Sequence, residues 1–147
     1  MPVSDSPAAQ RKLEDSLRHI VNLLEKHRLV ERMVDRDQVS PRHELIESLV
    51  HRQHLVELQL KLRSLHPADI AYILEALPLD DRLLVWRQIQ DDSGGEVLLE
   101  VSDAVRDWLI EVLERPVLVR VLGQLDADDL AELVDAIAED VLAEVLQ

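Results

Sequence analysis

The 147-residue sequence contains no cysteine and no phenylalanine, and its Tyr and Trp residues number three, Tyr72, Trp86 and Trp108. The lack of cysteine excludes disulfide bonds, thiolate metal sites and cysteine nucleophiles. With so few aromatic residues the core must consist of Leu, Val, Ile and Ala, which suits helix packing better than a sheet. No apolar run approaches the roughly 20 residues that cross a bilayer. We therefore expect a soluble, cytoplasmic chain that does not itself insert into a membrane.

The acidic residues are concentrated in the C-terminal part of the chain. Residues 1–64 contain eleven Lys and Arg against ten Asp and Glu, whereas residues 65–147 contain five against twenty, a net charge of −15. Such a surface repels nucleic acid and attracts cations or basic partners. We therefore expect no nucleic-acid partner.

Two long helices are predicted in the N-terminal part. Residues 8–35 carry apolar side chains at a largely helical period. Ser40 and Pro41 are typical of an N-cap followed by proline at the first helical position, so a second helix is expected from about Pro41 to Ser64. We treat residues 1–64 as an N-terminal helical extension.

The most informative pattern is an internal repeat of 24 residues in residues 65–147. Six apolar columns occur three times each: Ile73, Val97 and Val121; Leu74, Leu98 and Leu122; Leu77, Val101 and Leu125; Val85, Leu109 and Leu133; Trp86, Ile110 and Val134; Ile89, Leu113 and Ile137. A further column holds Pro78, Ser102 and Asp126, residues that end one helix or cap the next. Each unit is therefore predicted to be a short helix, a tight turn and a second helix.

One such unit cannot bury its apolar face alone, so neighbouring units should stack. The predicted fold class is all-α: a short right- or left-handed superhelix of helix-turn-helix repeats, similar to armadillo and HEAT solenoids, preceded by the two longer helices. An ordinary helical bundle is the alternative. The pattern predicts that nine side chains are buried: Leu74, Leu77, Leu98, Val101, Leu109, Leu113, Leu122, Leu125 and Ile137.

Histidines could form a metal site in the second long helix. His51 and His54 are three residues apart, and together with His43 they suggest zinc. The His-Glu-x-x-His motif is absent, however. We interpret these residues as solvated helix histidines.

Enzymatic activity is not expected. The sequence Asp80-Asp81-Arg82 is interpreted as a helix N-terminus, where acids favour the helix dipole. Trp86 and Trp108 are interpreted as packing residues. The sequence has neither a phosphate-binding glycine loop nor a nucleophile motif.

Several segments of the C-terminal part carry a family resemblance. Residues 65–71 read LHPADIA, residues 77–82 read LPLDDR, residues 94–101 read GGEVLLEV and residues 125–134 read LDADDLAELV. In this order and spacing they resemble the N-terminal domain of the MgtE family of magnesium transporters. The resemblance extends from about Leu65 to Gln147.

The resemblance implies a regulatory domain at the cytoplasmic face of the inner membrane. In this family the domain precedes a pair of CBS domains, a connecting helix and a membrane-embedded pore, and the transporter is a homodimer. Magnesium binds between the N domain, the CBS domains and the connecting helix. By neutralising facing carboxylates it holds the cytosolic part compact and the pore closed.

The resemblance also assigns cation ligands to Glu96 and to the pair Asp128 and Glu132. Glu132 stands where the family usually has Asp, which lengthens the reach of the side chain. Gly94 and Gly95 replace the usual small helical residues and are expected to loosen the start of the helix that carries Glu96.

The residue pattern by itself places Asp128 and Glu132 on one helix face, because they are four positions apart. A divalent cation would relieve their repulsion, and Ca²⁺ or Mn²⁺ could take the place of Mg²⁺. A solvated acidic face is the alternative.

Two functions from different classes remain open. The first is a Mg²⁺-sensing, gating domain of a magnesium transporter. The second is a cation-independent helical scaffold for protein–protein interaction, similar to flagellar motor-switch proteins. A scaffold would keep its partner without divalent cations, whereas a sensor needs them to neutralise its acidic face.

Overall fold

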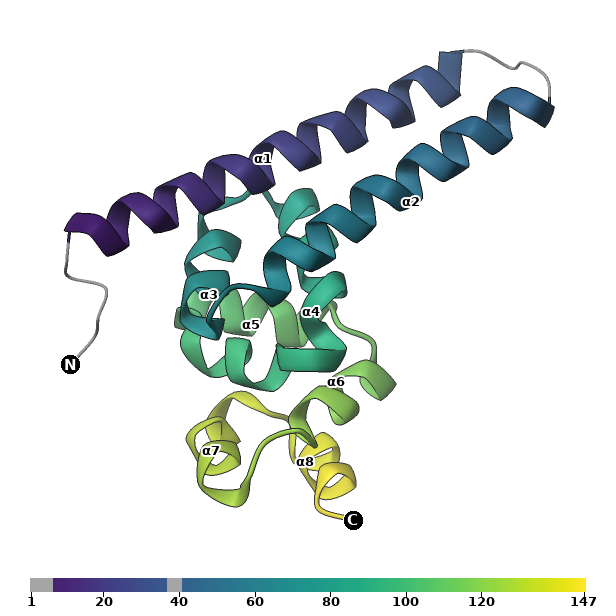
Figure 1. Ribbon diagram of the computed structural model, residues 1–147. Coiled ribbons are helices and arrows are strands. Elements are labelled where there is room, and N and C mark those ends of the chain that lie inside the picture. Colours follow the sequence, from purple (N-terminus) through teal and green to yellow (C-terminus); the bar gives the residue numbers. More distant parts are fainter. Residues whose placement is uncertain (1–6, 37–40) are drawn as a thin grey trace. The chain divides into compact units, whose positions relative to one another are not determined.

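The computed structural model describes residues 7–36 and 41–147. Within these ranges every regular element is a helix and no strand occurs, which confirms the all-α class. The chain divides into two compact units, Met1–Ser64 (unit 1) and Leu65–Gln147 (unit 2). Figure 1 labels their helices.

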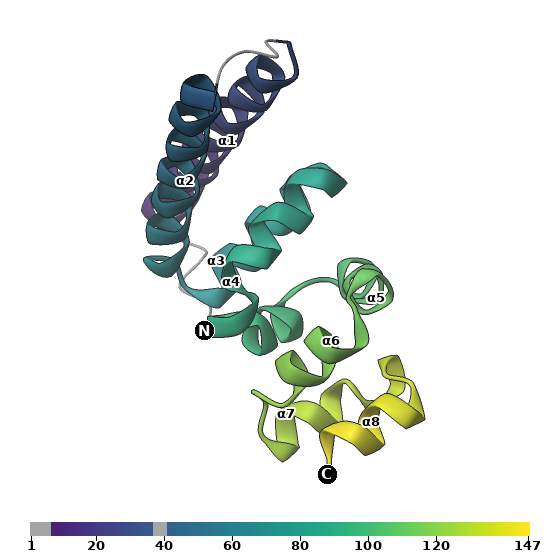
Figure 2. The ribbon, with the colours of Figure 1, turned by 90° about the vertical axis from the view of Figure 1, so that its right-hand side faces the viewer.

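Unit 1 is a hairpin of two long helices, α1 (Pro7–Arg36) and α2 (Pro41–Arg63). They lie side by side in both views (Figures 1 and 2). Buried apolar side chains come from both helices: Ile20, Leu23 and Leu24 from α1, and Leu58 and Leu62 from α2. Both predicted helices are therefore present, whereas the expected N-cap, Ser40, lies outside the described residues.

Unit 2, which is described throughout, contains six α-helices and one 3₁₀ turn. In chain order they are α3 (Pro67–Ala76), α4 (Leu79–Glu100), α5 (Asp103–Val112), α6 (Arg115–Leu122), α7 (Ala127–Glu132), η2 (Val134–Ala136) and α8 (Glu139–Val145). Contacts between helices link α3 to α4, α4 to α6, and α6 to α8. The helices that contact one another thus follow in sequence, with α5 and α7 placed between them along the chain.

The turn column of the 24-residue repeat supplies three helix N-caps. Pro78, Ser102 and Asp126 precede α4, α5 and α7 respectively. Ser102 Oγ accepts a hydrogen bond from the Val105 N–H, and Asp126 Oδ1 accepts one from the Asp129 N–H. Proline has no such acceptor, but its fixed φ suits a position where the chain turns. The predicted turns at this column are confirmed.

A second column of helix starts was not predicted. His66, Glu114 and Ala138 are in register with the repeat, and they occupy the N-caps of α3, α6 and α8. The fourth member of this column is Gln90, which lies inside α4. The prediction of a turn and a second helix in every repeat is therefore corrected in two ways. The later repeats contain an additional break, and α4 runs without a break through the position where that one would fall.

The side chain of Gln124 satisfies backbone groups of α4 next to Gln90. It accepts from the Gly95 N–H at 2.9 Å and donates to the carbonyl oxygens of Gln90 and Asp91, at 2.9 and 3.1 Å. In an undisturbed α-helix the Gly95 N–H would bond to the Asp91 carbonyl. Gln124 thus engages both partners of one helical hydrogen bond, and an insertion of this kind bends a helix.

The two glycines of α4 allow the end of α6 to approach closely. Gly94 and Gly95 are buried, and a Cβ atom added to Gly95 would lie 3.0 Å from Leu125 Cδ2 and 3.1 Å from the Val121 carbonyl oxygen. A side chain at position 95 would therefore be unusually tight against this segment. The expectation that the glycines loosen a helix start is wrong, because they lie inside α4 and provide a packing surface.

The core of unit 2 largely follows the repeat columns. Seven of the nine side chains predicted to be buried are buried: Leu74, Leu77, Leu98, Val101, Leu109, Leu122 and Ile137. Leu113 and Leu125 are partly exposed. Trp86 is completely buried, as expected of a packing residue. The periodicity therefore located most of the core.

Ion pairs between helices also repeat. Asp91 pairs with Arg120 between α4 and α6, and Arg115 pairs with Glu144 between α6 and α8. Each residue of the second pair lies 24 positions after a residue of the first, with the charges exchanged. The same contact thus occurs twice, one repeat apart. Superhelical stacking stays a prediction.

Candidate functional site

The predicted pair of acids lies on α7. Asp128 is in the first turn of this six-residue helix and Glu132 is its last residue, and both side chains are exposed. Helical residues four apart are neighbours on one face, as the spacing predicted. Neither carboxylate has a basic partner within the described part of the chain.

A third acid, Asp129, belongs to the same surface and was not singled out from the sequence. It is half-buried. Loss of solvent is the main cause that raises the pKa of Asp129, and the neighbouring Asp126, Glu132 and Asp128 raise it further. The negative charges around α7 therefore repel one another. The available signal was a cap followed by acids at two consecutive positions, Asp128 and Asp129.

Glu96 lies on α4, directly after the buried glycine pair, and its side chain is exposed. The structure does not gather it with the acids of α7. Among the described residues, no set of three metal-ligand atoms within 4.8 Å of one another includes Glu96, Asp128 or Glu132. These carboxylates do not form a closed cation site within unit 2, and their role as ligands stays a prediction.

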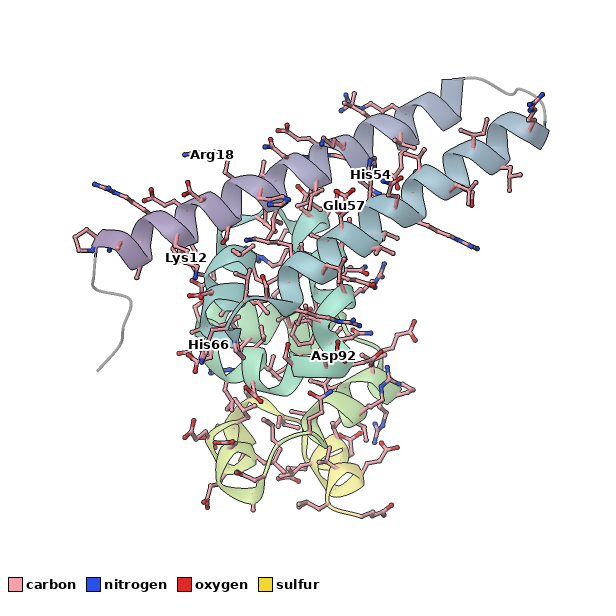
Figure 3. All side chains as sticks on the ribbon, viewed as in Figure 1. Lys12, Arg18, His54, Glu57, His66 and Asp92 are labelled. Carbon is pink, nitrogen blue, oxygen red and sulfur yellow. The ribbon has the colours of Figure 1, made fainter. Side chains whose placement is uncertain are left out.

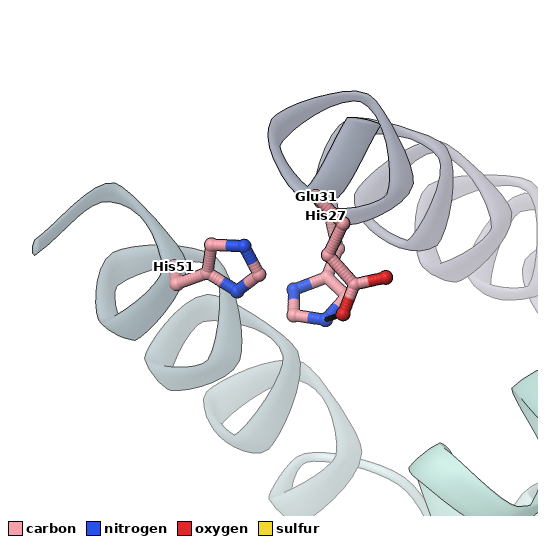
Figure 4. Close-up of side chains that lie close together, drawn as sticks. All are labelled: His27, Glu31 and His51. Carbon is pink, nitrogen blue, oxygen red and sulfur yellow. Dashed lines mark ion pairs between the residues drawn. The ribbon is translucent and has the colours of Figure 1, made fainter. Parts of the chain in front are cut away.

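The histidines form a separate cluster in unit 1. His51 of α2 packs against His27 of α1 with ring centroids 4.4 Å apart and an angle of 72° between the rings (Figure 4). One turn after His27, Glu31 places Oε1 3.3 Å from His27 Nε2. His54 lies on the side of α2 toward α1 (Figure 3), and its Nδ1 is buried. The side chain of His43 lies outside the described residues.

The interpretation of His51 and His54 as solvated histidines is corrected, because both are half-buried. Burial is the main cause that lowers the pKa of His27. His51 lowers it further, and Glu31 partly opposes this effect. Sequence reasoning missed His27 and Glu31. Their spacing of four residues in the first predicted helix was visible, but the register of the hairpin was not.

Comparison with protein families identifies the family to which unit 2 belongs. A family model described as the MgtE intracellular N domain matches residues 65–147, which are more than half of the chain. The chain belongs to this family. Searches of curated proteins and of solved structures give no significant match. The matched residues coincide with unit 2, and the hairpin of unit 1 lies outside them.

Membership in the MgtE family makes unit 2 the intracellular N domain of a magnesium transporter. Such a domain is regulatory, and the family is not one of enzymes. Among residues 7–36 and 41–147, no helix has the length and apolar character that a membrane span requires. The acids of α7 and α4 are thus part of an MgtE domain.

Proposed function

We propose that this MgtE domain senses cytosolic Mg²⁺ and gates the pore of a homodimeric transporter. A divalent cation bridges Glu96, Asp128 and Glu132 to acids of a CBS-domain pair and the connecting helix, at the cytoplasmic face of the inner membrane. Bridging stabilises the closed state. The observation that carries the proposal is the net charge of −15 on residues 65–147, which make up the MgtE domain.

The distribution of arginine partners supports this role for α7. Arg120 neutralises Asp91, and Arg115 neutralises Asp140 and Glu144. In contrast, Asp128 and Glu132 have no basic partner among the described residues. Their charge is thus available to a cation or to a partner domain.

The chemistry of Mg²⁺ suits a site shared between domains. Mg²⁺ keeps several of its waters and commonly takes one or two carboxylates from a protein element. The acids of α7 therefore supply part of a coordination shell, and facing acids with water supply the rest. Without the cation two acidic surfaces repel each other, so docking depends on the Mg²⁺ concentration. In the domain alone we expect weak binding, on the order of millimolar.

The test neutralises the pair in the full-length transporter. Asp128→Asn with Glu132→Gln removes two charges and preserves the side-chain shapes. A matched control is Asp107→Asn with Glu111→Gln, because these acids are also exposed and four residues apart, on α5. Magnesium flux is measured in vesicles at low and at high Mg²⁺ on the cytosolic side.

We expect the α7 variant to change the Mg²⁺ dependence of flux and the α5 control to preserve it. If Mg²⁺ acts by cancelling repulsion, the α7 variant closes at low Mg²⁺. If coordination itself is required, the pore stays open at high Mg²⁺. An unchanged Mg²⁺ dependence rejects sensing by this pair and favours the cation-independent scaffold.

A further inference from the structure

We propose that His27, Glu31 and His51 form a binding site for a divalent transition metal, with Zn²⁺ as its representative, that joins α1 to α2. This site lies in unit 1, outside the residues matched by the MgtE domain. Its residues and its ligand chemistry differ from those of the acidic surface of α7.

The distances are close to those of a metal centre. One potential ligand atom from each of the three residues lies within 4.8 Å of the other two. Tetrahedral ligands with bonds of about 2.1 Å lie about 3.4 Å apart. Glu31 Oε1 and His27 Nε2 are already 3.3 Å apart. The remaining adjustment is at most about 1.4 Å, which side-chain rotation supplies without moving either helix.

The ligands come from two different helices of the hairpin. His27 and Glu31 are four residues apart, so they share one face of α1, and His51 approaches from α2 (Figure 4). Helical bundles commonly build metal sites in this way, from inward-facing side chains on neighbouring helices. The set of two histidines and one glutamate is also a known zinc ligand set.

Packing alone leaves this cluster with unsatisfied polar atoms. The His27 side chain is 11% exposed. Both His27 Nδ1 and His54 Nδ1 are buried and have no hydrogen-bond partner among the described residues. Buried polar atoms without partners are rare in folded proteins and require an explanation. His27 has one nitrogen, Nε2, next to Glu31 and a second, Nδ1, that is buried without a partner. A metal bound by His27 Nδ1 would give this atom a partner, whereas His54 lies outside the proposed ligand set.

The ligand types distinguish the expected metal from Mg²⁺. Imidazole nitrogens suit Zn²⁺, Cu²⁺ and Ni²⁺, whereas Mg²⁺ prefers carboxylates, carbonyls and water. Excess Mg²⁺ should therefore not displace Zn²⁺ from the hairpin. Conversely, neutralising the acids of α7 should not affect Zn²⁺ binding.

The test is calorimetric titration of Zn²⁺ into the full 147-residue chain with millimolar Mg²⁺ present. We expect one strong site, lost in His27→Gln and in His51→Gln. Glu31→Gln tests the site without replacing a buried side chain, because Glu31 is exposed and its replacement should leave the hairpin folded. It should raise the Kd at least about tenfold. His19→Gln is the matched control, since His19 is an exposed histidine on the same helix.

A second measurement uses Co²⁺, whose visible absorption strengthens when four ligands surround it tetrahedrally. We expect this absorption in the unchanged chain and in His19→Gln, and a weaker one in the three ligand variants. Circular dichroism checks that each variant keeps its helical content. Zn²⁺ binding that is absent, that remains the same in Glu31→Gln and His51→Gln, or that falls equally in His19→Gln would overturn the proposal. If neutralising the α7 acids leaves the Mg²⁺ dependence of flux unchanged, the proposed Mg²⁺ sensing fails, but the metal site in the hairpin does not.

Discussion

Arg82 and Arg106 lie 24 positions apart and make the same hydrogen bond. In each, Nε donates to the backbone carbonyl oxygen eight residues earlier, that of Leu74 at 2.7 Å and that of Leu98 at 2.9 Å. The Nη2 atoms also lie 3.4 and 3.3 Å from the carbonyl oxygens of the C-cap residues that end α3 and α4. Because the last carbonyls of a helix lack partners within it, each arginine caps the preceding helix from the start of the next one.

Replacing Arg106 should therefore destabilise unit 2. We expect Arg106→Ala to lower the free energy of unfolding by about 1.5–3 kcal/mol, the usual range for a hydrogen bond to a charged group. Arg106→Lys should recover little, because an ammonium group lacks the planar fork of donors. Urea denaturation measures both changes. Arg87→Ala is the control, since Arg87 is exposed on α4, and an equal loss there would contradict the capping role of Arg106.

The two glycines of α4 should respond to alanine in opposite ways. Overpacking costs about 1–3 kcal/mol, and replacing a helical glycine returns about 0.5–1 kcal/mol. We expect Gly95→Ala to destabilise the domain by about 1–2 kcal/mol, because its Cβ would meet Leu125 and Val121. A Cβ on Gly94 would meet its nearest atoms at 3.4 Å, so Gly94→Ala should be neutral or stabilising. A larger loss of Tm in Gly94→Ala than in Gly95→Ala would show that α6 does not approach α4 at position 95.

The largest single loss is expected in the core. Leu109 is 0% exposed, so Leu109→Ala removes buried methyl groups and leaves a cavity. Such changes cost about 2–5 kcal/mol. Val112→Ala on the same helix is the control, because Val112 is 41% exposed. Denaturation midpoints measure the loss of stability in each variant. Similar losses for the two variants would place α5 outside the core.

The charge on Asp129 should make stability depend on pH. Its pKa is raised above the ordinary 3.8 in the folded chain. A carboxyl group whose pKa is raised by folding contributes its full stabilisation at pH values below its pKa in the unfolded chain. This stabilisation is lost as the pH rises through its pKa in the folded chain. We expect Asp129→Asn to raise the Tm near neutral pH and to leave it unchanged at about pH 3. The same Tm gain at both pH values would show that charge is not its cause. Asp107→Asn on α5 serves as the control.

The parts of the fold that were predictable depend on nearby residues. Ser102 and Asp126 begin helices through bonds to backbone groups three positions away, so a repeat in the sequence reveals them. The bonds of Gln124 to α4 were not predictable, because Gln124 lies 34 positions after Gln90.

In the candidate sites, too, contacts between residues far apart in the sequence were not predictable. Family resemblance located Asp128 and Glu132, and the structure places both on an exposed face of α7. In the proposed function they hold a cation together with acids of other domains, so their role as ligands stays a prediction. The contact between His27 and His51 depends on the register of two helices, which their apolar spacing does not determine.

The hydrogen bond from the Gly95 amide to Gln124 makes the exchange rate of that amide proton a measure of contact between two helices. Most amide protons inside a helix exchange with solvent when that helix opens, whereas the Gly95 proton is held by a side chain that follows α6. Its exchange rate therefore follows the docking of that segment onto α4. Protection of neighbouring amides such as Leu98 follows the opening of α4 itself, so a comparison of these two rates separates slippage between helices from unwinding within one.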